Sequence, residues 1–198
     1  MRNGRFLRWQ DFPFHQGQNW LQRVVVIGTS GSGKTTFARR LADLLGVPHL
    51  ELDAFHWLPH WQERPRDEMR AQVAAAVRAP RWVADGNYSS VRDIVWPRAT
   101  AVVWLNYALP LVLARLLRRT LHRVAIHKRL FGGNTESFRR AFLSQDSIFL
   151  WALRTYARRR REYPLLSMAP QYAHLRFLEF RRPREAEDFL ERLRARRG

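Results

Sequence analysis

One stretch of the sequence joins a β-branched run, a glycine-rich loop and a helix pattern without interruption, and it constrains the fold more than any other feature. Residues 24–27 read Val-Val-Val-Ile, a run typical of a buried parallel strand. Residues 28–35 read Gly-Thr-Ser-Gly-Ser-Gly-Lys-Thr and match the pattern G-x-x-x-x-G-K-[ST] at every fixed position. Residues 34–45 place apolar side chains on one helix face, and Gly46 ends that pattern. This succession predicts the first strand, loop and helix of a parallel α/β sheet.

The glycine-rich loop predicts a phosphate-binding site. Its glycines let successive backbone N–H groups point inward as an anion nest, and the helix that follows adds the positive end of its dipole. Lys34 would reach the β- and γ-phosphates of a nucleotide, and the Thr35 hydroxyl would ligate Mg²⁺. ATP and Mg²⁺ are therefore the expected cofactors. The candidate nucleotide-binding residues are Gly28, Thr29, Ser30, Gly31, Ser32, Gly33, Lys34, Thr35 and Thr36.

Strand and helix patterns alternate along the rest of the chain. Further strands are expected at 49–52, 82–84, 101–105 and 175–180. Because helical patterns separate them, the expected fold class is α/β, with a parallel sheet covered on both faces. Residues 1–22 show no clear period and are expected to be a loose N-terminal extension, which leaves 23–198 as a single domain.

Composition excludes several classes of protein. The chain has 198 residues, enough for one domain, and its lack of cysteine excludes a disulfide framework or a thiolate metal site. No apolar run approaches the roughly 20 residues that span a bilayer, and no signal-peptide pattern follows the first arginines, so a cytoplasmic protein without a membrane span is expected. The formal charge is +18, from 35 basic and 17 acidic side chains. An arginine excess of this kind suits the binding of phosphate groups.

Two aspartates stand at the expected carboxyl ends of strands, where open α/β sheets bind their ligands. Asp53 follows the second strand and is the candidate general base or acceptor-orienting group. Asp85 follows the third strand and is the candidate carboxylate that acts on Mg²⁺ through water. The order along the chain does not fix the distance of either group from the metal, so the two roles could be exchanged. Each aspartate could instead serve only as a turn or helix cap.

The segment after Asp53 carries His56, Trp57, His60 and Trp61. Histidines four residues apart invite a metal-site interpretation, but Pro59 interrupts the helix between them and no third ligand is evident. His56 and Trp57 are therefore candidates for the wall of an acceptor pocket, with simple packing as the alternative.

These motifs resemble the adenylate-kinase-like P-loop proteins, and within them the family often named DNA topology modulation proteins. The resemblance covers roughly residues 23–195 and rests on the phosphate loop, on Leu-Asp-Ala with His-Trp at 52–57, and on Asp-Gly-Asn-Tyr at 85–88. It implies a nucleoside-monophosphate-kinase fold: a three-layer sandwich with a five-stranded parallel sheet and an arginine-bearing helical lid after strand four. It also implies that the loop at 181–183 approaches the adenine.

The resemblance places the substrate near Asn87 and Tyr88 as well. Asp85 and Gly86 match the Asp-Gly that adenylate kinases carry at the end of strand three, whereas Asn-Tyr-Ser at 87–89 replaces their aromatic-Pro-Arg. This departure removes an arginine that contacts substrate phosphate in adenylate kinases. AMP is therefore not the expected acceptor.

Basic side chains concentrate in residues 107–163, where 13 arginines and lysines face three acidic residues. Arg115, Arg119 and Arg123 recur at four-residue steps, on roughly one helix face, and are the candidate catalytic arginines of a lid over about 109–162. Arg139 is a further lid candidate. The four consecutive arginines at 158–161 point in different directions on a helix, so a solvated surface is expected there, with nucleic acid or an acidic lipid as the alternative partner.

The expected function is transfer of the γ-phosphoryl group of ATP to a small-molecule or nucleotide acceptor. The alternatives are a nucleic-acid-associated P-loop ATPase or regulator, in which the basic helices bind the phosphate backbone, and a polynucleotide 5′-hydroxyl kinase. The residue pattern identifies neither the acceptor nor the oligomeric state.

Overall fold

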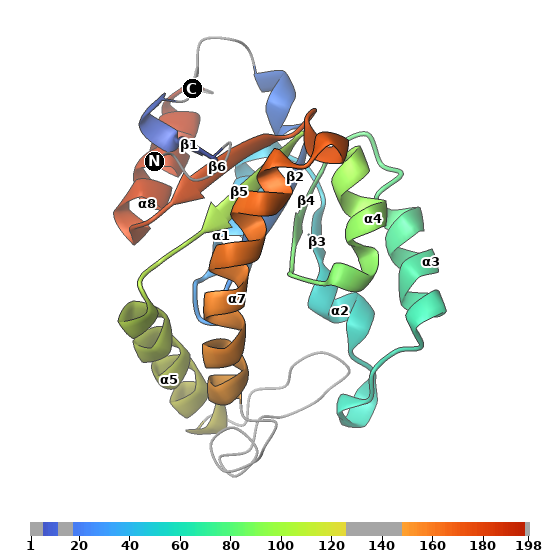
Figure 1. Ribbon diagram of the computed structural model, residues 1–198, viewed down its shortest axis with the longest axis vertical. Coiled ribbons are helices and arrows are strands. Elements are labelled where there is room, and N and C mark those ends of the chain that lie inside the picture. Colours follow the sequence, from blue (N-terminus) through green and yellow to red (C-terminus); the bar gives the residue numbers. More distant parts are fainter. Residues whose placement is uncertain (1–5, 12–17, 126–147, 197–198) are drawn as a thin grey trace.

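The computed structural model describes residues 6–11, 18–125 and 148–196, and these residues form an α/β fold around one parallel sheet (Figure 1). The sheet has six strands in the order β1-β6-β5-β2-β4-β3. In chain order the strands are β1 (Phe6–Arg8), β2 (Arg23–Gly28), β3 (His49–Glu51), β4 (Trp82–Asp85), β5 (Ala101–Leu105) and β6 (Arg176–Phe180). The expected fold class is confirmed, but the sheet has one strand more than the five expected.

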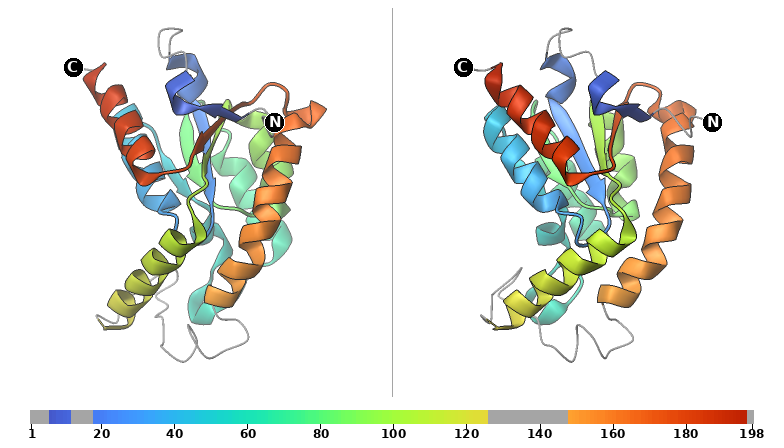
Figure 2. Two further views of the ribbon diagram at one scale, coloured as in Figure 1. Left: turned by 60° about the vertical axis from the view of Figure 1, so that its left-hand side comes forward. Right: turned by 90° about the vertical axis from the view of Figure 1, so that its left-hand side faces the viewer.

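Helices cover both faces of this sheet. The α-helices are α1 (Lys34–Leu45), α2 (Leu52–His56), α3 (Arg66–Ala76), α4 (Arg92–Val95), α5 (Leu109–Ala125), α7 (Ile148–Met168) and α8 (Pro183–Ala195). Short 3₁₀ turns are η1 (Trp9–Asp11), η2 (Gln18–Leu21), η3 (Pro59–Trp61), η4 (Ser89–Val91), η5 (Trp96–Arg98) and η7 (Pro170–Tyr172). Figure 2 shows α1 and α8 on one side of the sheet and α7 on the other.

Two hydrophobic cores follow from the alternation of side chains along the strands. Val24 and Val26 of β2 face α1 and α8, where they pack with Phe37 and Phe189. The intervening Val25 and Ile27 face the other core, to which α3, α4 and α7 contribute apolar side chains. The continuous β-branched run of β2 thus reflects burial on both faces. It places Gly28, the last residue of β2, at the carboxyl edge of the sheet's interior.

The sixth strand lies in the segment expected to be a loose extension, and that expectation is wrong for the N-terminal residues that the structure describes. Phe6 pairs with Phe177 and Arg8 with Glu179, which makes β1 the parallel neighbour of β6. Trp9 is only 5% exposed, and the guanidinium carbon of Arg192 in α8 lies 4.6 Å from its ring centroid. Three residues are too few to show the alternation by which a strand is recognised in a sequence. The extended conformation of β1 therefore depends on its pairing with β6 and could not be predicted locally.

The boundaries of one functional segment also differ from expectation. The second predicted strand ends at Glu51, earlier than expected, and the five-residue helix α2 begins at Leu52. Asp53 therefore lies in the first turn of α2, just beyond the strand. None of the helices in the described ranges is long and apolar enough to cross a membrane.

The buried position of Trp9 predicts that the N-terminal segment contributes to stability. Replacing Trp9 with Ala should lower the free energy of unfolding by about 3 kcal/mol, because a buried aromatic side chain is deleted. Urea denaturation followed by circular dichroism measures this loss. Leu7→Ala in the same segment is the control, since Leu7 is 40% exposed and should cost less than about 1 kcal/mol. Equal losses in the two variants would contradict the docking of Trp9.

Candidate active site

The glycine-rich loop leaves the carboxyl end of β2 and turns back into α1. Gly31 and Gly33 have φ values of 90° and 88°, a conformation that residues with a Cβ rarely adopt. A Cβ on Gly31 would also lie 2.6 Å from the carbonyl oxygen of Val112 in α5. The amide of Ser32 donates to the carbonyl of Thr29 over 2.9 Å, which closes the turn. The positive φ values favour glycine at both positions, and the close approach of α5 adds a steric reason at Gly31.

Lys34 and Thr35 are the first two residues of α1, at the positive end of the helix dipole. The Thr35 hydroxyl donates a hydrogen bond of 2.7 Å to Oδ2 of Asp85, the last residue of β4. This contact follows from the sheet order, because β4 is the parallel neighbour of β2 and their carboxyl ends meet at one edge. Of the predicted loop residues, Thr29, Ser30 and Ser32 are buried, Gly31 is partly buried, and Thr36 is exposed.

The Asp85 carboxylate is 1% exposed, and both of its oxygens are engaged. Oδ2 accepts from Thr35, and Oδ1 lies 2.7 Å from Nε2 of His49 in β3. The oxygens of Thr35 and Asp85 are hard donors of the kind that Mg²⁺ prefers, and Mg²⁺ sites of this type use one or two protein oxygens with phosphate and water. The donors at Thr35 and Asp85 therefore fit a nucleotide-bound Mg²⁺.

The acceptor-side candidates gather around Asp53. The Tyr88 hydroxyl donates a hydrogen bond of 2.8 Å to Oδ1 of Asp53. The His56 ring lies 4.8 Å from the Tyr88 ring and 4.5 Å from that of Trp57, measured between centroids. Burial raises the pKa of Tyr88, and the charge of Asp53 raises it further, so Tyr88 keeps its proton and acts as a donor. One wall of the site is thus a carboxylate beside three aromatic rings.

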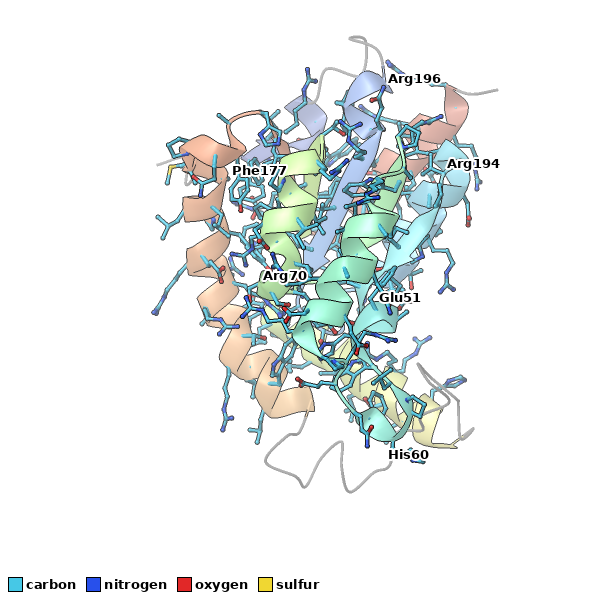
Figure 3. The ribbon with its side chains drawn as sticks, turned by 90° about the vertical axis from the view of Figure 1, so that its right-hand side faces the viewer. Glu51, His60, Arg70, Phe177, Arg194 and Arg196 are labelled. Atoms are coloured by element: carbon cyan, nitrogen blue, oxygen red, sulfur yellow. The ribbon has the colours of Figure 1, made fainter. Side chains whose placement is uncertain are left out.

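His60, in contrast, takes no part in this group. It is exposed and lies at the tip of the segment beyond α2 (Figure 3), with a positive φ of 61°. Nε2 of His56 lies 3.6 Å from Oε1 of Glu63. The two histidines thus differ in their surroundings, since His56 contacts Glu63 and Trp57 whereas His60 is exposed.

Asn87 faces the glycine-rich loop. Its Oδ1 accepts from the Gly28 amide over 3.1 Å, and its Nδ2 donates to the Gly28 carbonyl over 2.6 Å. The Tyr163 hydroxyl of α7 donates to the same Oδ1 over 3.2 Å. In these contacts Asn87 clamps the start of the loop, a role distinct from the substrate contact expected of it.

The arginines of α5 differ in what the structure describes of them. Nη1 of Arg115 donates to the Ser32 carbonyl over 3.3 Å, and its guanidinium carbon lies 5.5 Å from the Tyr107 ring centroid. Arg115 therefore lies against the glycine-rich loop, and its role as a catalytic arginine stays a prediction. Arg119, one turn further along α5, is partly buried. The side chain of Arg123 and all of Arg139 lie outside the described part of the chain.

Sequence reasoning missed one arginine of the 158–161 run. Arg158, Arg160 and Arg161 are exposed, as expected, whereas Arg159 is only 5% exposed. Arg159 belongs to the buried stripe of α7, which consists of Ala152, Thr155, Arg159, Tyr163 and Ser167. Because the stripe steps by three and four residues, the helical period counted back from Tyr163 would have identified Arg159.

Within the described residues Arg159 forms no ion pair, although the charges of Glu162 and Asp53 act on it from a distance and partly oppose the effect of burial. Its guanidinium carbon stacks 4.6 Å from the ring centroid of Trp151, and Nη1 is buried and makes no hydrogen bond. The nearby carboxylate of Glu162 pairs with Arg92 over 2.7 Å. Burial lowers the pKa of Arg159 accordingly. A buried cation without an anionic partner is costly, and a negatively charged ligand would relieve this cost.

No protein-family model matches the sequence, and no curated protein matches it. Solved structures do resemble the fold. The chain is similar to the shikimate kinase from Acinetobacter baumannii in complex with shikimate, with 19% identity over 87% of this chain and 90% of that one and a TM-score of 0.54. It is also similar to the shikimate kinase from Bacteroides thetaiotaomicron, with 15% identity over 88% and 97% of the two chains and a TM-score of 0.51.

A gluconokinase from Sinorhizobium meliloti 1021 aligns with 20% identity over 89% of this chain and 95% of that one, at a TM-score of 0.48. The likeness to the two shikimate kinases shows that the chain shares their fold. It gives no support to the narrower resemblance to the DNA topology modulation family.

The clamp on Gly28 predicts a role for Asn87 in nucleotide affinity. Asn87→Ala removes both hydrogen bonds to Gly28, and ATP affinity should fall by about tenfold because the loop amides lose their fixed orientation. Isothermal titration calorimetry measures the affinity. Ser89→Ala, at an exposed position two residues away, is the control and should leave the affinity unchanged. An Asn87→Ala protein that binds ATP normally would show that the clamp is dispensable.

Proposed function

We propose that the protein transfers the γ-phosphoryl group of ATP to a hydroxyl group of a small-molecule acceptor. The hydrogen bond between Thr35 and Asp85 carries this proposal, because it joins the phosphate loop to a buried carboxylate in the arrangement that a Mg²⁺-nucleotide requires. The P-loop kinase fold supports it, as does the likeness to a shikimate kinase bound to shikimate, a small molecule. Transfer to a nucleotide acceptor stays the variant that the sequence also allows.

The glycine-rich loop would hold the phosphates through its amides, with Lys34 at the β- and γ-phosphates. Mg²⁺, when bound, would neutralise charge on the phosphate oxygens, and Thr35 and Asp85 are the residues that would hold it. The contact with Thr35 favours Asp85 over Asp53 for this role. The loop at 181–183 also begins at the carboxyl edge of the sheet, directly after β6, and would approach the adenine.

Asp53 would orient the acceptor and accept its proton. One oxygen of Asp53 is held by Tyr88, which leaves Oδ2 to accept a hydrogen bond from an acceptor hydroxyl. In the transfer, the hydroxyl oxygen forms a bond to the γ-phosphorus while the bond from that phosphorus to the bridging oxygen of ADP breaks. The hydroxyl proton passes to Asp53, and ADP leaves with the electron pair of the broken bond. His56, Trp57 and Tyr88 would provide the faces against which the acceptor packs.

Arg115 and Arg159 would supply positive charge to the reacting groups. Arg115 already contacts the loop at Ser32, close to where the phosphates would lie. Arg159 projects from the buried stripe of α7 without an anionic partner among the described residues, so bound phosphoryl or acceptor anions would compensate it. Arg119 and Arg123 remain lid candidates on the same helix as Arg115.

The nucleic-acid alternatives gain no support from the fold or from the solved structures that it resembles. The assay that tests the proposed function still includes them as outcomes. Purified protein is incubated with ATP, Mg²⁺ and a panel of hydroxyl acids, sugars, nucleoside monophosphates and 5′-hydroxyl oligonucleotides, and ADP release is followed. Release that depends on a small molecule and yields its phosphorylated product supports the proposal. Release stimulated only by nucleic acid, without a phosphorylated product, would overturn it.

Substitution of Asp53 separates its proposed role from that of Asp85. Asp53→Asn should reduce acceptor-dependent ADP release by about 10³-fold, since it removes the proton acceptor, and should leave ATP affinity unchanged. Lys34→Ala is the comparison, because it should lose ATP affinity as well. The two readouts are steady-state kinetics and calorimetric titration of ATP. A marked loss of Mg²⁺-dependent ATP affinity in Asp53→Asn would mean that the two aspartates exchange roles.

Substitution of Arg159 should lower the activity of the protein and raise its stability. Arg159→Met should lower kcat/KM by about 10²-fold or more, because a charge that stabilises the reacting groups is lost. The same change should raise the free energy of unfolding by about 1 kcal/mol, because it removes a buried charge that has no ion-pair partner among the described residues. Arg161→Met at an exposed position is the control and should change neither quantity. A destabilised Arg159→Met protein with normal activity would contradict the proposed role.

A further inference from the structure

The carboxylate of Asp85 is oriented by two neighbours, one on each oxygen, and only one of them belongs to the phosphate loop. We propose that the other, His49, is a positioning residue for the metal site: it holds the Asp85 carboxylate so that Oδ2 faces Thr35. This inference rests on the proposed function, because it concerns the same Mg²⁺-nucleotide.

The two contacts on Asp85 are equally short. Thr35 Oγ1 lies 2.7 Å from Oδ2, and His49 Nε2 lies 2.7 Å from Oδ1. The side chain of His49 is 15% exposed, so little water competes for its ring nitrogen. With the Thr35 hydroxyl donating to Oδ2, its oxygen keeps lone pairs for a metal ion, and the imidazole N–H on Oδ1 prevents the carboxylate from rotating away.

The sheet register explains why a histidine at position 49 reaches this carboxylate. In the parallel pair of β3 and β4, His49 lies opposite Val83 and Glu51 lies opposite Asp85. Alternation places His49, Glu51 and Asp85 on the same face of the sheet. This is the face against which α1 packs, and Thr35 at the start of α1 contacts Asp85 there. His49 therefore lies level with Val83, two residues before Asp85 along the strand direction, and its imidazole ring reaches forward to the Asp85 carboxylate.

Glu51 makes such an orienting contact necessary. It lies beside Asp85 in the register, at the end of β3 (Figure 3), and burial raises its pKa, followed by the charge of Asp85. A second carboxylate this close repels the first, so an unrestrained Asp85 would turn away from it. His49 supplies a donor on Oδ1 that holds Asp85 in place. Groups that orient a metal-binding side chain in this way typically contribute 10- to 100-fold to metal affinity.

The test compares two side chains of equal length at position 49. In His49→Gln, the amide nitrogen can occupy about the place of Nε2 and donate to Asp85, whereas His49→Met fills the same space without a donor. Isothermal titration calorimetry measures ADP affinity with and without Mg²⁺, and the ratio of the two affinities is the Mg²⁺-dependent gain. Binding of Mn²⁺ in the presence of ADP, followed by electron paramagnetic resonance, measures the metal directly.

The expected result is that His49→Met loses about 10- to 100-fold of the Mg²⁺-dependent gain and that His49→Gln keeps it within about threefold. ADP affinity without Mg²⁺ should be the same in the wild type and both variants. If the Met variant does not fold, His49→Asn takes its place, since its amide nitrogen lies too close to the backbone to reach Asp85.

Three results would overturn the proposal. The Met and Gln variants could keep the same gain, both could lose metal-free ADP affinity as a structural defect would cause, or the wild type could show no gain with Mg²⁺. In the first two cases the proposed function survives if ADP still binds, whereas a wild type that gains nothing from Mg²⁺ would also remove the metal role on which that function rests. A wild-type protein that binds no ADP at all would instead refute the proposed function itself.

Discussion

The short hydrogen bond between Thr35 and Asp85 is the contact on which the candidate site depends. It joins the first turn of α1 to the end of β4, two elements that are 50 residues apart in the chain. The contact is available only because β2 and β4 are parallel neighbours whose carboxyl ends lie at one edge. The glycine-rich loop and the buried carboxylate take their relative positions from this pairing, and the pairing of β3 with β4 adds the acceptor-side segment to the same edge. The order of the strands, more than any single side chain, therefore builds the site.

Much of the site could be predicted from the sequence because its chemistry is encoded locally. The loop at 28–35 carries its glycines, its lysine and its threonine in one continuous run between a strand and a helix. Asp85 could be placed because it ends a strand, and parallel strands end together. Asp53 was placed by the same argument and lies just past the expected strand, in α2. Tyr88 lies beside Asp53, but its role toward a substrate stays a prediction.

The features that could not be predicted depend on partners far away in the chain. β1 is three residues long, and only β6 gives it a strand conformation. His49 resembles any strand histidine until its register against β4 is known. Arg159 was hidden by its own sequence context, since four consecutive arginines read as a solvated surface although one of them follows the buried stripe of α7. For β1 and His49 the deciding information is tertiary. The burial of Arg159 could have been inferred from the helical period counted back from Tyr163.

The clamp on Gly28 has a consequence for communication across the molecule. Tyr163 of α7 donates to the same Asn87 oxygen that accepts from the Gly28 amide, so α7 and the phosphate loop share one amide group. A displacement of α7 changes the hydrogen bonding of that amide, and an altered loop changes the seat of α7 in turn. Thermodynamic linkage is reciprocal. If a ligand that contacts α7 changes the affinity for the nucleotide, the nucleotide changes the affinity for that ligand by the same factor. The Asn87 side chain is thus one point at which α7 and the phosphate loop meet.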